Sequence, residues 1–120
     1  SSRIYSSQDI ERWHINEMKS LLSRFSGVKF IFDDVKQKYY PVLRDAITSF
    51  RSKNEGKPLV VIDDTPFIDF DILDYPVNDI EEIFLLKGSD AAIWGPKASN
   101  GIIVIITQRG KSTKIEQKEE

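Results

Sequence analysis

Three runs of mainly apolar residues occupy the second half of the chain and predict its core strands: Leu59–Ile62, Glu82–Lys87 and Ile102–Thr107. A strand turns successive side chains to opposite faces, so a strand that is apolar on consecutive positions must be buried on both faces. One connection is too long for a simple hairpin, because Asp63–Asp79 must return the chain. The pattern therefore predicts a mixed sheet with small helices on its faces.

Apolar residues at helical spacing predict an amphipathic helical segment over Gln8–Phe25, packed on this sheet. The spaced residues are Ile10, Trp13, Met18, Leu21, Leu22 and Phe25, of which Trp13 and Leu22 are interpreted as core. Ser6 followed by Asp9 predicts the start of the helix, because a short oxygen side chain accepts from exposed backbone N–H groups. Gly27 predicts its end, because glycine tolerates the left-handed conformation. The alternative is a break, with a second, shorter helix that begins at Asn16.

Two shorter strands are predicted ahead of the core, at Val28–Phe32 and Tyr39–Leu43, joined by the polar turn Asp33–Lys36. Pro41 has no N–H to donate to a neighbouring strand, so the second strand is expected at a sheet edge or to begin late. A helical turn is expected through Ala46–Phe50, followed by a charged loop.

Turn residues precede the last strand. Ser89–Trp94 predicts a short helix that Gly95 ends, and Asn100-Gly101 predicts a turn that leads into Ile102–Thr107. Residues 1–110 are therefore expected to form one α+β domain, with a mixed sheet of about four to five strands and short helices packed on it. The charged residues 111–120 are expected to be a tail or linker.

The composition is that of a globular domain and excludes several classes of function. The chain has 120 residues, 40% hydrophobic and 30% charged, and a formal net charge of −2. Nucleic acid is not an expected partner, because phosphate binding needs concentrated Lys and Arg. The sequence has no cysteine, which excludes disulfides, thiol catalysis and cysteine-ligated metal.

The chain is expected to be an excised or processed piece of a longer protein. It opens at Ser1 without a methionine, and it carries no visible signal peptide. Its longest unbroken apolar run, Ile102–Ile106, is far shorter than the ~20 residues that a membrane helix needs. The chain alone is therefore not expected to insert into a membrane.

An acidic cluster raises the question of a cation site. Five carboxylates fall between positions 63 and 74: Asp63, Asp64, Asp69, Asp71 and Asp74. Calcium favours such oxygen-rich groups, and the last three are weak candidates for its ligands. The order of residues excludes an EF-hand, which needs a loop glycine. A solvated acidic loop with Asx turns is the simpler interpretation and the one we favour.

No catalytic site, cofactor or transition metal is expected. His14 is the only histidine, and without cysteine or a second histidine the usual metal-ligand set is missing. No nucleophile motif accompanies it, so we interpret it as a partly exposed side chain on a helix flank. Gly88 and Gly95 lack the Gly-Lys-Ser/Thr that ends a phosphate-binding loop, and they are interpreted as backbone turns.

The stretch from Pro58 to Gly110 reads PLVVIDDTPFIDFDILDYPVNDIEEIFLLKGSDAAIWGPKASNGIIVIITQRG. It resembles the plug domain of TonB-dependent outer-membrane receptors, most closely the starch-utilisation type of nutrient receptor. A similar stretch in that family follows the pattern PLxVIDGxP, then DIExIEVLKG, then SAAxYGxxxxNGVIxITTKRG. The earlier segment Leu21–Val28 is similar to the family's dlLxxxPGV. The resemblance covers roughly residues 4 to 110.

Several positions depart from the family pattern. Ser26 stands where proline is usual, and Asp45 and Asp64 stand where glycine is usual. Trp94 replaces a tyrosine, and Pro96 follows a glycine where a small polar residue is common.

The resemblance implies a plug that fills the lumen of a β-barrel, blocks free diffusion and contacts substrate at its outer loops. The implied partners are that lumen and, through an N-terminal box, TonB, which remodels the plug by pulling. The implied location is the outer membrane or periplasm of a Gram-negative bacterium. The alternative is a plug-like interaction or structural domain of a barrel-free periplasmic or surface protein, for which the departures at Asp45, Asp64 and Pro96 leave room.

Overall fold

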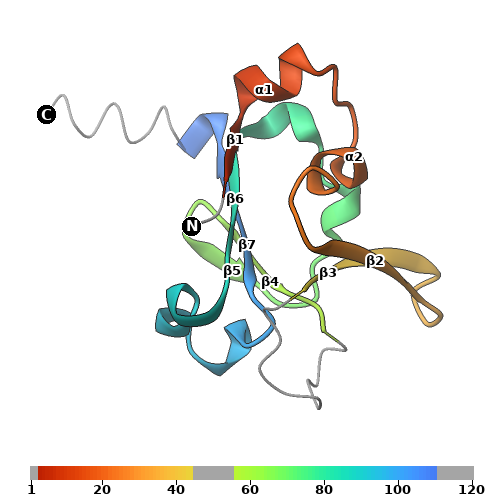
Figure 1. Ribbon diagram of the computed structural model, residues 1–120, viewed down its shortest axis with the longest axis vertical. Coiled ribbons are helices and arrows are strands. Elements are labelled where there is room, and N and C mark those ends of the chain that lie inside the picture. The colour runs from red at the N-terminus through yellow and green to blue at the C-terminus, as the bar shows by residue number, and fades with distance from the viewer. Residues whose placement is uncertain (1–2, 45–55, 111–120) are drawn as a thin grey trace, which may run out of the picture.

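The computed structural model describes residues 3–44 and 56–110 (Figure 1). Within these ranges the strands are β1 (Ile4–Ser6), β2 (Val28–Asp33), β3 (Lys38–Leu43), β4 (Leu59–Ile62), β5 (Thr65–Phe67), β6 (Ile80–Leu86) and β7 (Ile102–Thr107). The helical turn expected over Ala46–Phe50, the departure at Asp45 and the tail at 111–120 lie outside the described residues.

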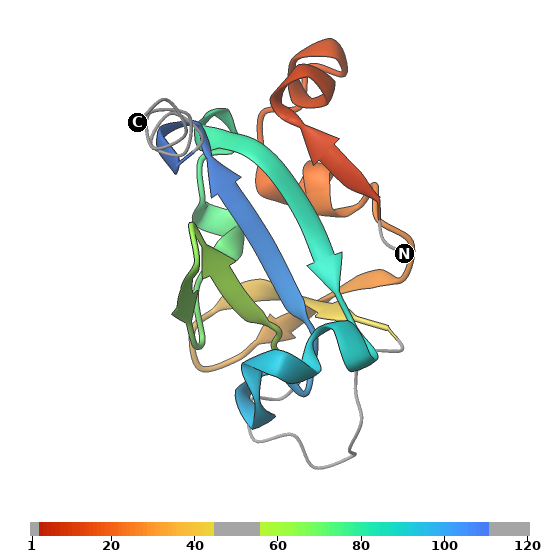
Figure 2. The same ribbon diagram turned by 90° about the vertical axis from the view of Figure 1, so that its left-hand side faces the viewer.

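Five strands form the main sheet, in the order β1-β6-β7-β4-β5. Strands β4 and β7 pair in parallel, and the other neighbours pair antiparallel. Figure 2 shows this sheet face-on, with β6 and β7 at its centre. The three predicted core strands and the mixed sheet are confirmed, and so is the α+β class.

One face of the main sheet is buried, and the opposite face is buried at β4 and at the start of β7 and only partly buried along β6 and the rest of β7. Ile83, Ile103 and Ile105 face one cluster, which the N-terminal helices complete. Residues from β4 and β7 on the opposite face, Leu59, Val61 and Ile102, pack beneath the short turns of residues 88–98. Figure 1 shows these two layers, with α1 and α2 on one side of the sheet.

The N-terminal segment is two helices, α1 (Ser7–Arg12) and α2 (Met18–Leu22), rather than one over Gln8–Phe25. Ser6 caps α1 as predicted: its hydroxyl accepts from the Asp9 N–H, and the Asp9 carboxylate accepts from the Ser6 N–H. The helix breaks at His14, which adopts a left-handed φ of 55°. The alternative of a break is therefore confirmed, although the second helix begins two residues after Asn16.

Gly27 does not end the helix, and that prediction is wrong. Helix α2 stops at Leu22, whereas Gly27 has a φ of 82° and leads into β2. Its carbonyl accepts from the Arg44 N–H at 2.8 Å. A side chain at position 27 would lie 3.3 Å from the Arg44 Cβ, so glycine also permits this close approach of two backbones.

Strands β2 and β3 form a separate two-stranded sheet, a hairpin that projects from the body of the molecule in Figure 1. Their positions match the two predicted short strands. Pro41 pairs with Phe30 across the hairpin. Both strands of a two-stranded sheet are edge strands, so Pro41 is tolerated, and the predicted edge position of its strand is confirmed.

Five single 3-10 turns follow β5: η1 (Ile72–Asp74), η2 (Val77–Asp79), η3 (Gly88–Asp90), η4 (Ala92–Trp94) and η5 (Pro96–Ala98). Residues 108–110, after β7, are also helical. The short helix predicted over Ser89–Trp94 is two such turns, and Gly95, with a φ of 81°, ends the second. The predicted turn at Asn100-Gly101 is present, and the Gly101 carbonyl accepts from the Leu59 N–H. None of the described helices is long and apolar enough to cross a membrane.

Candidate functional site

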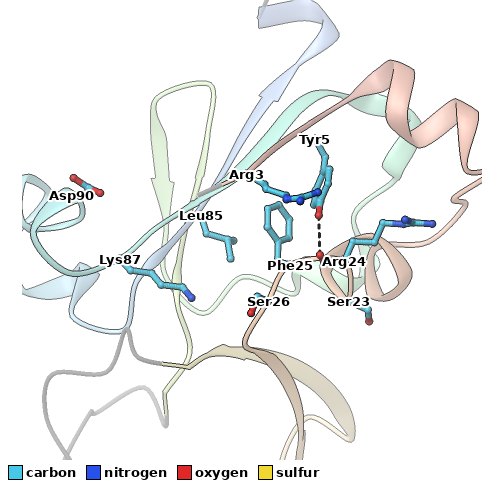
Figure 3. Close-up of a pocket in the computed structure, with 9 residues that line it drawn as sticks. All are labelled: Arg3, Tyr5, Ser23, Arg24, Phe25, Ser26, Leu85, Lys87 and Asp90. Carbon is cyan, nitrogen blue, oxygen red and sulfur yellow. Dashed lines mark hydrogen bonds between the residues drawn. The ribbon is translucent and has the colours of Figure 1, made fainter. Parts of the chain in front are cut away.

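A cleft of about 810 Å³ lies between the β1–β6 side of the sheet and the segment that follows α2 (Figure 3). Tyr5, Phe25 and Leu85 supply its apolar wall. The rim carries the side chains of Arg3, Ser23, Arg24, Ser26, Lys87 and Asp90. The volume falls within the range of about 300–1,000 Å³ that is typical of small-molecule sites.

Tyr5 anchors the short strand β1 beside this cleft. Its ring lies edge-on against Phe25 at 4.6 Å and Trp13 at 5.6 Å between centroids. Its hydroxyl donates to the Arg24 carbonyl at 2.8 Å, as Figure 3 shows. The Arg24 guanidinium stacks on the Trp13 ring at 3.9 Å, so the backbone on this side of the cleft is fixed by aromatic contacts.

The rim of the cleft is basic. The side chains of Arg3 and Lys87 face it, whereas the Arg24 side chain turns away toward Trp13, and Asp90 is the one carboxylate among the lining residues (Figure 3). Such a rim favours anionic groups over cationic ones. The lining residues of the cleft include no histidine.

A second feature joins the hairpin β2–β3 to the loop after β5. Side chains of alternating charge form a network that we call the aspartate–lysine lattice: Asp33, Lys36, Lys38, Lys57, Asp69, Asp71 and Asp74. Its most enclosed pair is Lys57 with Asp33, whose Nζ and Oδ2 atoms lie 2.8 Å apart. Lys57 also contacts Asp69 at 2.9 Å and lies over the Tyr40 ring.

Hydrogen bonds within the lattice shift the pKa values of Asp33, Asp69, Asp71 and Lys57. The hydrogen bond from Lys57 lowers the pKa of Asp33 and that of Asp69, and the one from Lys36 lowers the pKa of Asp71. Burial acts to lower the pKa of Lys57, but hydrogen bonds to Asp33 and Asp69 outweigh it and raise that pKa. The charged form of each partner is therefore stabilised by the other.

The weak calcium candidates Asp69, Asp71 and Asp74 lie in this lattice, opposite lysine side chains. Among the described residues, no group of three or more acidic, histidine or cysteine side chains is arranged to hold a metal ion. A calcium ion would have to displace Lys36 and Lys38, which already contact these carboxylates. Calcium binding stays a hypothesis, and a calcium-dependent rise in melting temperature would support it.

The two other members of the acidic cluster make the turn between β4 and β5. Asp63 and Asp64 have φ values of 47° and 69°, as a two-residue type I′ turn requires. Asp63 accepts from the N–H and the hydroxyl of Thr107, which ties the turn to the end of β7. A side chain at Gly110 would lie 2.3 Å from the Asp63 Oδ1 atom, so this contact explains the glycine there.

Replacing Asp64 with glycine is expected to stabilise the chain by about 0.5–1 kcal/mol. A non-glycine residue in the left-handed region carries strain, and glycine is preferred at the second position of this turn. The change should appear as a rise in the midpoint of urea unfolding. Asp64→Ala provides the control, because alanine disfavours positive φ and should lower that midpoint; equal midpoints for the two variants would contradict the turn assignment.

His14 is exposed, in agreement with its interpretation as a flank residue, and it lies apart from both the cleft and the lattice. Sequence reasoning missed the cleft residues Arg3, Tyr5 and Arg24. It also missed the lysines of the lattice. The one sequence feature that indicated the lattice was the pair Lys36 and Lys38, two positions apart on the hairpin. No sequence pattern indicated the cleft.

Comparison with known proteins identifies the family to which this fold corresponds. The family model described as TonB-dependent Receptor Plug Domain matches residues 1–102. Among solved structures, a mutant of the ferric enterobactin receptor PfeA from Pseudomonas aeruginosa, in complex with enterobactin, superposes with a TM-score of 0.67 at 19% identity. The siderophore receptor PirA from Acinetobacter baumannii gives a TM-score of 0.67 at 20% identity.

These matches involve most of this chain and a small part of each receptor. Both superpositions cover 89% of this chain and 17% of the receptor chain. The pyoverdine-bound receptor FpvA of Pseudomonas aeruginosa is similar over 90% of this chain and 14% of its own, with a TM-score of 0.63 at 13% identity. At such identities the superpositions show a shared fold.

Proposed function

The chain belongs to the TonB-dependent receptor plug family, and from that membership we propose that it is the plug of an outer-membrane nutrient receptor. In this role it fills the lumen of a β-barrel formed by other parts of the same protein, gates that lumen and contacts the substrate. The family match over residues 1–102 carries the proposal. The superposition of this fold on 17% of each of two siderophore receptor chains supports it.

The departures from the family pattern do not favour a barrel-free domain where they can be inspected. Asp64 adopts the left-handed conformation that the usual glycine would supply, so the turn keeps its geometry. Pro96 begins a 3-10 turn directly after Gly95, a position at which proline needs no donor. Asp64 and Pro96 therefore no longer favour the barrel-free alternative. Asp45 and the charged tail, which also motivated it, lie outside the described residues.

The proposal extends to location and partners. The parent protein resides in the outer membrane of a Gram-negative bacterium, its barrel lumen surrounds this domain, and TonB engages a segment outside the described residues. The substrate is a nutrient taken up by active transport. Neither catalysis nor a cofactor is part of this function.

The reading frame beyond Glu120 provides the first test. A receptor requires many segments of about ten residues that alternate apolar and polar positions, because only a closed barrel satisfies backbone groups in lipid. Soluble-domain sequence there would instead establish the barrel-free alternative. A stop codon right after Glu120, with a start codon just before Ser1 and no signal, would refute both.

Deleting residues 1–110 from the full-length receptor is expected to abolish nutrient uptake and to admit antibiotics too large for the intact outer membrane. Uptake is lost because the substrate contacts and the element that TonB remodels are removed with the plug, and antibiotics enter because a barrel without its plug is an open pore. Growth on the nutrient and sensitivity to vancomycin measure the two effects. Full-length receptor at equal abundance in the outer-membrane fraction is the control, and a correctly inserted deletion variant that leaves resistance unchanged would contradict the gating role.

A further inference from the structure

We propose that the aspartate–lysine lattice is an ionic latch: it holds the loop Ile68–Asp71 against the hairpin β2–β3 and releases it, with the main sheet still folded, when the lattice is screened or protonated. The inference concerns a conformational device within this chain. It neither uses nor requires the proposed plug function.

Few apolar contacts hold this loop. Strand β5 ends at Phe67 and the turn η1 begins at the buried Ile72, so both ends of the loop are anchored. Between them Ile68 is exposed, whereas Phe70 is half-buried: it packs against the main core cluster and lies 5.3 and 6.1 Å from the rings of Phe67 and Tyr75. Apart from Phe70, the middle of the loop depends on polar contacts to stay in place.

The polar contacts of this loop hold Asp69 in a left-handed backbone conformation. Its φ of 58° is uncommon for a residue with a side chain and carries strain. Its carboxylate lies 2.9 Å from the Lys57 Nζ and 3.2 Å from the Lys36 Nζ, and its carbonyl accepts from Lys36 at 3.2 Å. Two lysines from separate parts of the chain thus secure a backbone conformation that would otherwise relax.

The remaining links connect the same two elements. Lys36 contacts Asp71 at 3.1 Å, and Lys38 contacts Asp71 at 3.5 Å and Asp74 at 2.6 Å. These side chains are between about a third and two-thirds exposed, so ions in solution screen their attraction. The Lys57–Asp33 pair, at 15% and 9% side-chain exposure, is shielded. Lys57 also contacts the loop at Asp69, whose side chain is 47% exposed. Salt therefore weakens the links from Lys36 and Lys38 first and the Lys57–Asp69 link after them, while the main sheet stays folded.

The sign of the pH dependence follows from the direction of each pKa shift. The pKa values of Asp33, Asp69 and Asp71 lie below their ordinary 3.8, so the latch is intact above that value and opens as pH falls through the folded values. The pKa values of Lys36, Lys38 and Lys57 are raised above 10.5, so the latch is lost only at pH above that value. Between these limits ionic strength, not pH, controls the latch.

Backbone amide order parameters measure this release directly. In the chain at low salt and pH 7, the amides of Ile68–Asp71 are expected near the rigid value of about 0.85, falling below ~0.6 in 1 M NaCl or as pH is lowered through the depressed pKa values of Asp33, Asp69 and Asp71. The amides of β6 and β7 should stay rigid in the same samples. Simultaneous loss of order in the loop and in β6 and β7 would overturn the proposal, because release would then be unfolding.

Two variants remove single links, each with a matched control. Asp69→Asn keeps a side chain that tolerates positive φ but loses the charge, and Lys36→Met keeps the aliphatic stem. Both are expected to lower the order parameters of Ile68–Asp71 at low salt to the values of the wild type in 1 M NaCl. Asp34→Asn and Lys97→Met make the same chemical changes at exposed positions outside the lattice and should leave the loop rigid. A loop that stays as rigid in Asp69→Asn and Lys36→Met as in these controls would refute the latch.

Discussion

Replacing Ile105 with aspartate is expected to prevent folding. Ile105 has no exposed surface and lies in β7, at the centre of the main sheet, where its side chain meets the cluster that includes Ile83. A carboxylate there finds no partner, and burying an unpaired charge costs several kcal/mol, about the whole stability of a domain of this size. Circular dichroism should show no cooperative melting transition for this variant.

Two controls separate this effect from a general intolerance of substitution. Ile93→Asp makes the same chemical change at a side chain that is 87% exposed and should leave the melting temperature almost unchanged. Ile105→Val removes one methylene from the same buried site and should cost about 0.5–1.5 kcal/mol. A normal melting transition for Ile105→Asp would mean that β7 is not the centre of the core.

The strands that are buried on both faces were predictable because they carry apolar side chains at consecutive positions. Leu59–Val61 and Ile102–Ile103 are apolar at adjacent positions, and the structure buries all of them. Strand β6 is less uniform, because its alternate residues are only partly buried. The apolar run was nevertheless long enough to mark it as a strand.

The short elements were less predictable because tertiary contacts define them. Strand β1 has three residues, pairs with β6 and is fixed by Tyr5 against aromatic rings from the region around α2. Strand β5 has three exposed residues, including a proline, and it exists because the Asp63-Asp64 turn folds it back on β4. Neither has a local pattern strong enough to stand alone. The same holds for the break at His14, where a left-handed residue interrupts an otherwise continuous helical pattern.

The cleft and the lattice depend on segments that the chain order keeps apart. Asp69 and Lys36 are 33 positions apart, and Lys57 comes from a third segment. From the sequence, the aspartates form a local cluster, which suggested a calcium ion from solution as their counterion. The structure supplies the cations from the chain itself, because the hairpin β2–β3 brings its lysines to the loop.

Replacing Lys57 with methionine is expected to lower the melting temperature by about 5–10 °C, the largest effect of any single change in the lattice. The aliphatic stem is kept, so the packing over the Tyr40 ring survives. What is lost is the cation beside Asp33, a residue that is only 8% exposed. An uncompensated carboxylate at an enclosed site destabilises the folded chain.

Asp33→Asn tests whether the Asp33 carboxylate causes the lower melting temperature of Lys57→Met. The Asp33 Oδ1 atom accepts from the N–H groups of Val35 and Lys36, and the asparagine carbonyl can retain both contacts while the charge is removed. The double variant Lys57→Met/Asp33→Asn removes the enclosed carboxylate charge together with the cation beside it. The melting temperature of the double variant should therefore fall by less than the sum of the decreases in the two single variants. Additive decreases in melting temperature would show that the two side chains do not interact. A Lys57→Met variant that melts at the same temperature as the exposed control Lys97→Met would show that the enclosed pair contributes nothing to stability.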